Sequence, residues 1–167
     1  ASHLASLGHR RVAIVTLPSG LDSPGRWMEH AEESRISVDV TRDRLSGARD
    51  VYPDAPAFAA AASSIDEGFA AGRAIFAARP HPTAVIAQSD LLAVGVLRAA
   101  EEAGLRVPED VSITGFDGIV VDGLAPYELT TLVQPAWQKG RAAGEAVAAL
   151  LAGDTPDSQW FTSTFRL

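Results

Sequence analysis

Short apolar runs alternate with amphipathic stretches along the chain once glycine and proline are treated as breaks. The runs at 11–17 (RVAIVTL), 83–88 (TAVIAQ) and 111–116 (VSITGF) are continuous, as in strands buried on both faces of a parallel sheet. Residues 129–133 and 159–166 are predicted as further strands, and 36–41 as a weakly alternating one. These runs supply the strands of a single sheet.

Helices are predicted between the strands, over 24–34, 64–78, 90–103 and 135–152. Ser23-Pro24 and Ser89 are suited to helix N-caps, and Gly104 to a helix end. Residues 42–56 lack periodicity, and the alanine-rich stretch 57–62 is taken as the lead-in to the next helix. Strands separated by helices of this length imply an α/β fold with a doubly wound parallel sheet.

Polar side chains follow several of these strands, where open parallel sheets bind ligands. Arg26 is predicted in the first turn of its helix, Ser89 and Asp90 begin another helix, and Asp117 follows an apolar run. A guanidinium with two carboxylates suits a sugar-like ligand. Each residue also has a structural alternative: Ser89 as a cap, Asp90 as a capping or helix-dipole partner, Asp117 as a turn former and Arg26 as a solvated side chain.

Two helices carry apolar residues that one sheet face cannot cover. Leu91, Leu92, Val94 and Val96 wrap around the helix 90–103, which is therefore either deeply buried or in contact with another subunit. The helix 135–152 places Trp137 and several small or apolar residues along one stripe. It needs a surface to pack against, and little of the chain is free to provide one.

Composition narrows the classes of function. The chain has 167 residues, about one domain, and a net charge of −7, so it lacks the basic surface of a nucleic-acid-binding domain. It has no cysteine, and no apolar run approaches the roughly 18 residues of a membrane span. This composition suits the cytosol. The start at Ala1, without methionine or signal peptide, indicates a fragment of a longer protein.

Enzymatic signatures are absent from the sequence. No G-x-S-x-G or G-x-x-x-x-G-K-[ST] motif occurs, so nucleophilic hydrolysis and nucleotide hydrolysis lack their local signals. Glu29, His30 and Glu33 could share a helix face, but without a second histidine at metal spacing a solvated charged face is the better interpretation. We expect no catalytic residue, no metal site and no cofactor.

Motifs in a fixed order resemble the effector-binding core of the lactose-repressor (LacI/GalR) transcriptional regulators. The matching stretches are 3–4 (HL), 7–13 (LGHRRVA), 82–84 (PTA), 89–90 (SD), 93–95 (AVG), 104 with 106–112 (RVPEDVS), 115–117 (GFD), 129–131 (LTT) and 134–135 (QP). The resemblance implies a lobe like those of type I periplasmic binding proteins, with effector held between two lobes. It also implies a DNA-reading helix-turn-helix upstream.

The resemblance assigns roles to particular residues. Arg26, Ser89, Asp90, Asp117 and Gln134 fall at effector-contacting positions, although Ser89 stands where the family usually has Asn, and Glu29 replaces the Gly usual three residues after the Arg. The helix from residue 90 and the loop after residue 117 resemble the family's dimer surface.

The resemblance also divides the chain and sets its function. Residues 1–132 form the C-terminal lobe, 133–153 a helix crossing to the other lobe, and 154–167 a returning strand. The implied function is effector sensing for a cytoplasmic, homodimeric repressor with no membrane partner. Such a repressor would contact operator DNA only through the helix-turn-helix, which this chain lacks. The alternatives are an extracytoplasmic sugar-binding protein of this fold and an α/β enzyme.

Overall fold

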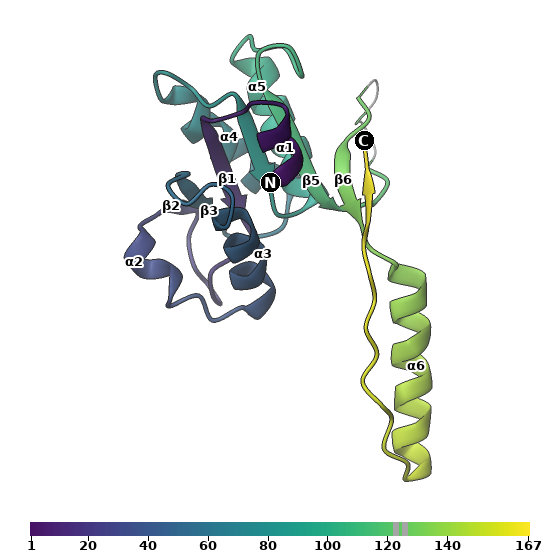
Figure 1. Cartoon of the computed structure of the whole chain (residues 1–167). Coiled ribbons are helices and arrows are strands. Elements are labelled where there is room, and N and C mark those ends of the chain that lie inside the picture. Colours follow the sequence, from purple (N-terminus) through teal and green to yellow (C-terminus); the bar gives the residue numbers. More distant parts are fainter. Residues whose placement is uncertain (122–123, 125–126) are drawn as a thin grey trace.

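The described residues of the chain (1–121, 124 and 127–167 of a computed structural model) form a seven-stranded sheet in the order β2-β3-β1-β4-β5-β6-β7 (Figure 1). The strands are β1 (Val12–Thr16), β2 (Arg26–Met28), β3 (Ala57–Ala59), β4 (Ala84–Ala87), β5 (Ser112–Asp117), β6 (Thr130–Val133) and β7 (Thr164–Arg166). The five central strands are parallel, and β2 and β7 are antiparallel edges. The expected α/β class with a predominantly parallel sheet is confirmed.

Helices lie on both faces of this sheet. They are α1 (Ser2–Ser6), α2 (His30–Glu33), α3 (Asp39–Arg49), α4 (Ile65–Ala77), α5 (Asp90–Glu102) and α6 (Ala136–Ala152). Successive side chains of β1 point to opposite faces of the sheet. Ala13 and Val15 belong to the core under α4 and α5, whereas Ile14 packs with residues of α3 on the other face.

The two helices α4 and α5 pack unusually closely. A Cβ added at Gly68 would lie 2.3 Å from Leu92 O, and one at Gly95 would lie 2.1 Å from Ile65 O. Only glycine allows the two backbones to approach this far. Helix α5 is consequently enclosed by α4 on one side and by the sheet on the other.

This enclosure decides between the two explanations of the apolar helix. The side chains of Leu92, Val94 and Val96 are at most 1% exposed within the chain, and Leu91 is partly exposed. The assignment of Leu92, Val94 and Val96 to a dimer interface is therefore corrected, because their apolar surface is already covered by their own chain.

The predictions between residues 18 and 62 were largely wrong. The predicted helix 24–34 is the edge strand β2 followed by the single turn α2, which begins at a capping box between Glu29 and Glu32. The predicted strand 36–41 and the aperiodic stretch after it contain α3, and the stretch 57–62 contains β3. Pairing of β2 with β3 overrides the local Ser-Pro signal for a helix.

The remaining predicted elements are confirmed. Strands at 11–17, 83–88, 111–116 and 129–133 are β1, β4, β5 and β6, and the last strand is limited to Thr164–Arg166. Helix α6 projects away from the sheet, with the chain after it running back alongside (Figure 1), and none of its residues is buried. Among the described residues, no helix combines the length and apolar character needed to cross a membrane.

Candidate functional site

Polar side chains converge where β4, β5 and β6 end. Gln88 follows β4, Asp117 is the last residue of β5, and Gln134 follows β6. Because these strands are parallel neighbours, their carboxyl ends meet at one edge of the sheet. A fourth side chain, Arg44, reaches the same edge from α3.

Arg44 is the cation of this site. Its guanidinium lies over the ring of Phe116, 3.7 Å from the ring centroid, and Nη2 lies 3.3 Å from Asp117 Oδ1. Nη1 donates to the backbone carbonyl of Gln88, and only 14% of the side chain is exposed. Burial lowers the pKa of Arg44, and the nearby Asp117 acts in the opposite direction. An arginine nevertheless stays protonated, so the site holds an ordered positive charge.

Asp117 is held from two sides and remains accessible. Gln134 Nε2 donates to Asp117 Oδ1 at 2.8 Å, and the Gln134 backbone N–H donates to the Asp117 carbonyl at 3.0 Å. The backbone of Asp117 has φ +120°, a region that residues other than glycine rarely adopt. About 30% of its side chain is exposed, so the carboxylate can accept further hydrogen bonds from a ligand.

Lys139 orients Gln134, and Gln88 links the neighbouring strand ends to α3. Lys139 Nζ donates to Gln134 Oε1 at 2.8 Å, which orients the Gln134 amide toward Asp117. The buried Gln88 accepts from the backbone N–H of Leu17 at 3.0 Å and donates to the carbonyl of Thr41 at 3.2 Å. It thereby joins the ends of β1 and β4 to α3, the helix that carries Arg44.

Asp90 has a structural role at this edge. Its Oδ2 accepts from the backbone N–H groups of Gly118 at 2.7 Å and Ile119 at 2.9 Å, and Oδ1 accepts from Thr131 Oγ1 at 2.6 Å. The residue is fully buried. The expectation that Asp90 contacts effector directly is therefore corrected: this carboxylate holds the chain that follows Asp117.

Ser89 is the N-cap of α5. Its Oγ accepts from the Leu92 N–H at 3.3 Å and lies 2.9 Å from Ser63 Oγ, and the residue is 1% exposed. Ser89 therefore acts as a helix cap, the structural role that the sequence allowed for it, because its hydroxyl satisfies an N–H of the first helical turn.

Arg26 lies away from the convergence. It is on the edge strand β2, where Nη1 forms an ion pair with Glu32 Oε2 at 2.7 Å. Four strand spacings separate β2 from β5, or about 19 Å across the sheet. The prediction of Arg26 as the cation beside Asp117 is therefore wrong, and Arg44 occupies that place.

A signal for Arg44 was present in the sequence. The glycine three residues after the arginine, which is missing after Arg26, stands at Gly47 after Arg44. The segment 42–56 carries little apolar periodicity, so the helix that presents Arg44 was missed. Gln88 was likewise missed, because a glutamine at the end of an apolar run gives no local signal of its contacts.

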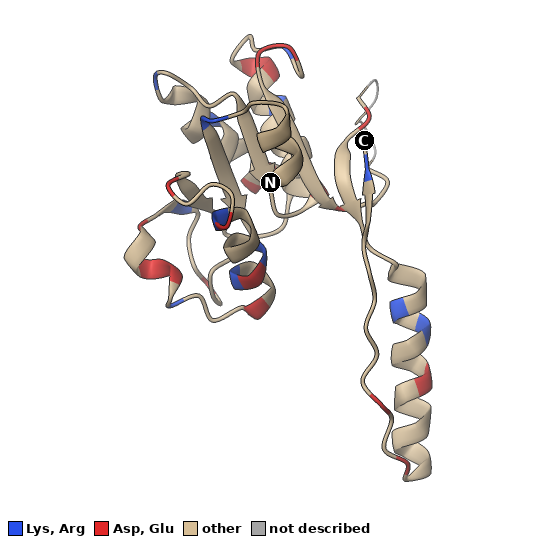
Figure 2. Cartoon of the chain, viewed as in Figure 1, with Lys and Arg blue, Asp and Glu red and all other residues tan. Residues whose placement is uncertain are grey.

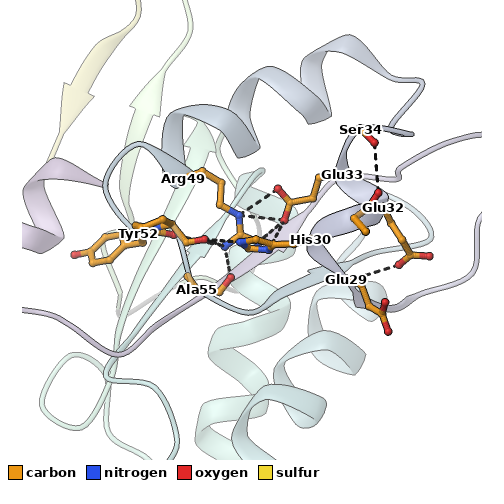
Figure 3. Close-up of polar contacts among 10 residues, drawn as sticks. Glu29, His30, Glu32, Glu33, Ser34, Arg49, Tyr52 and Ala55 are labelled. Carbon is orange, nitrogen blue, oxygen red and sulfur yellow. Dashed lines mark hydrogen bonds and ion pairs between the residues drawn. The ribbon is translucent and has the colours of Figure 1, made fainter.

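The acidic group around His30 forms a structural network (Figure 3). Arg49 Nη2 and His30 Nδ1 lie 2.5 Å and 3.2 Å from the same Glu33 oxygen, Oε1. Arg49 also donates to the carbonyls of Pro53 and Ala55, and His30 Nε2 donates to the Pro53 carbonyl at 2.7 Å. These contacts attach α2, and the loop that follows α3, to the end of α3. In the described part of the chain, no group of three or more metal-ligating side chains is placed to hold an ion.

The fold and this edge define the class of the protein. A parallel sheet with converging polar groups at its strand ends, continued by a helix that leaves the lobe, is the arrangement of a periplasmic-binding-protein-like lobe. Residues 1–165 match the family model of the periplasmic binding protein-like domain. The chain belongs to this family.

The relatives are transcriptional regulators. The chain is 32% identical over 160 residues to the HTH-type transcriptional regulator IpsA of Corynebacterium glutamicum, covering 90% of this chain and 44% of that protein. It is 30% identical over 144 residues to the ribose operon repressor of Bacillus subtilis, covering 80% and 44%. The chain thus spans less than half the length of these curated relatives.

Solved structures agree with this placement. A LacI-family regulator from Corynebacterium glutamicum superposes with a TM-score of 0.87 at 26% identity, covering 97% of this chain and 50% of the other. A LacI-family regulator from Arthrobacter in complex with lactose gives 0.74 at 26% identity, covering 99% and 59%. The resemblance to LacI-family effector-binding domains is confirmed.

Proposed function

We propose that this chain senses a small polyhydroxyl effector for a transcriptional repressor and carries out no chemical reaction. The observation that carries the proposal is the contact of Arg44 with Asp117 and Gln134 at the strand ends. A planar guanidinium donates to neighbouring hydroxyls, and a carboxylate accepts from them. The lactose complex and the ribose operon repressor among the relatives support this class of ligand.

The direct contacts are assigned to Arg44, Asp117 and Gln134. Asp117 retains exposed surface, and Gln134 is held by Lys139 with its amide toward that carboxylate. Ser89 and Asp90 act indirectly, by starting α5 and fixing the chain after Asp117. This division gives the ligand a preorganised cation and an anion, which lowers the ordering cost of binding.

The exposed C-terminal elements support a second lobe. Trp137, Leu151 and Trp160 are 72%, 85% and 95% exposed, a large apolar surface on α6 and the segment after it. We assign residues 1–132 to one lobe, 133–153 to the crossing helix and 154–167 to the returning strand. Effector would lie between the lobes, at the end of the sheet from which α6 departs.

The switch follows from two lobe arrangements. Effector shifts the equilibrium only as far as it binds one arrangement more tightly than the other. In a homodimer, the lobe arrangement would set the spacing of DNA-reading heads that lie outside this chain. Leu91 of α5 remains as a predicted dimer contact. The expected dimer surface also includes the loop after Asp117, of which 122–123 and 125–126 lie outside the described residues.

A ligand screen on the full-length protein tests this function. We expect a mono- or disaccharide to raise the thermal midpoint and to bind saturably in calorimetry. Asp117→Ala should weaken that binding by about tenfold or more, since a charged hydrogen-bonding partner is lost. Asp110→Ala, just before the start of β5 and far from Asp117, is the matched control. Equal affinities of the wild type and Asp117→Ala would refute the assignment.

A further inference from the structure

A cavity lies at the ends of the strands opposite to Asp117. It has a volume of about 610 Å³ and is lined by residues that include Arg10, Arg11, Trp27, Tyr52, Asp54 and Pro80. Small-molecule sites typically have volumes of roughly 300–1,000 Å³. Because β1 begins at Val12 and ends at Thr16, this cavity lies at the amino ends of the strands, away from Asp117.

Two consecutive arginines stand at one end of the cavity. Arg10 and Arg11 directly precede β1, where Figure 2 shows basic residues, in a chain with a net charge of −7. Both residues are exposed, and among the described residues neither guanidinium forms an ion pair or a hydrogen bond. Guanidinium groups bind phosphate in a planar, often bidentate geometry. The pair therefore offers unused donors to an anion.

An indole stands at the other end. Trp27 of β2 meets the buried Phe58 ring edge-on, with the ring centroids 5.5 Å apart, and 41% of Trp27 is exposed. Strand register places Trp27 level with Phe58 and Val15, so it lies about 13 Å from Arg11 along the strands and about 10 Å across them. A fixed, half-open aromatic face is suited to stacking with a planar ring.

We propose that this cavity binds a ring-bearing organic phosphate of mononucleotide size. The phosphate would bind Arg10 and Arg11, the ring would stack on Trp27, and the Asp54 carboxylate would accept from a hydroxyl or amino group between them. The backbones of Arg11 and Trp27 are about 16 Å apart, and their long side chains span part of that distance, which leaves a gap of about the length of such a ligand. The site is distinct from the proposed effector site, which uses none of these residues.

Calorimetry on the full-length protein with adenosine 5′-monophosphate tests the site. We expect saturable binding, tighter than that of adenosine or of inorganic phosphate alone. Arg10→Gln with Arg11→Gln should weaken it about tenfold or more, and Trp27→Leu about fivefold. The matched controls are Arg98→Gln, an exposed arginine on α5, and Trp160→Leu, and both should bind as the wild type does.

Several results would overturn the proposal. One is no saturable binding of the nucleotide at concentrations up to about 1 mM. Another is inorganic phosphate binding as tightly as the nucleotide, which would leave no role for Trp27. Loss of nucleotide binding in Asp117→Ala but not in the arginine variants would place the ligand at the other end of the sheet. Equal losses in the control variants would contradict it as well.

Discussion

The Arg44 guanidinium lies over the ring of Phe116, with Cζ 3.7 Å from the ring centroid, and its Nη2 reaches Asp117 Oδ1. Arg44 belongs to α3, whereas Phe116 and Asp117 end strand β5. The packing of α3 on the sheet therefore sets the position of the positive charge. The cation–π contact and the ion pair together hold the guanidinium in place. A ligand at this edge meets an arginine that is already ordered.

Replacing Asp90 is predicted to destabilise the chain strongly. Asp90→Ala leaves the buried Thr131 hydroxyl and two partly buried backbone N–H groups without their acceptor. The free energy of unfolding should fall by about 3 kcal/mol or more in urea denaturation.

A matched control for Asp90 is Asp66→Ala. Asp66 also occupies the first turn of its helix, α4, but it is exposed, so its loss should cost only about 0.5 kcal/mol through the helix dipole. Equal, small losses for the two variants would show that the Asp90 contacts contribute little.

The close packing of α4 and α5 gives a second prediction. Gly95→Ala would place a Cβ 2.1 Å from Ile65 O and 2.4 Å from Phe69 N, and these backbone atoms cannot rotate away. We expect the variant to lose about 3 kcal/mol of unfolding free energy. Gly140→Ala in α6 meets nothing within 4 Å and should gain up to about 1 kcal/mol. A stable Gly95→Ala variant would contradict the observed helix approach.

Asp110 provides a prediction about pH. Hydrogen bonds from the Arg106 side chain, and then from its backbone N–H, lower the pKa of Asp110 from 3.8 to about 2. A depressed carboxyl pKa stabilises the folded chain above pH 3.8, and this contribution is lost as the pH falls from 3.8 through 2. NMR titration should find Asp110 still ionised at about pH 3, and Arg106→Gln should raise its pKa toward the ordinary range. An unchanged pKa in Arg106→Gln would contradict this cause.

The central strands could be predicted because their residues are buried on both faces. Continuous apolar runs such as 11–17 and 83–88 have few alternatives to a buried strand, and they are β1 and β4. By contrast, α3 buries only Thr41, Leu45 and Ala48, a stripe too weakly apolar to stand out among its charged residues. The three-residue strand β3 consists of Ala-Phe-Ala and is defined by its neighbours in the sheet.

Of the candidate site, the sequence predicted only the residues that adjoin the ends of strands. Asp117 and Gln134 lie directly after or at the end of predicted strands, and the structure brings them into contact. Arg44 is 73 residues from Asp117 and belongs to the helix that was missed. No local pattern reports a contact of that kind. The burial of Asp90 likewise depends on Gly118 and Thr131, which approach it only in the folded chain.

The measurement closest to the central claim compares two arginines. Effector binding to the full-length protein is measured by calorimetry for the wild type, Arg44→Ala and Arg26→Ala, with the saccharide found in the screen. We predict that Arg44→Ala weakens binding about ten- to a hundredfold and that Arg26→Ala leaves it within about twofold. Thermal midpoints establish that both variants are folded. Full affinity in Arg44→Ala, or a larger loss in Arg26→Ala, would contradict the account.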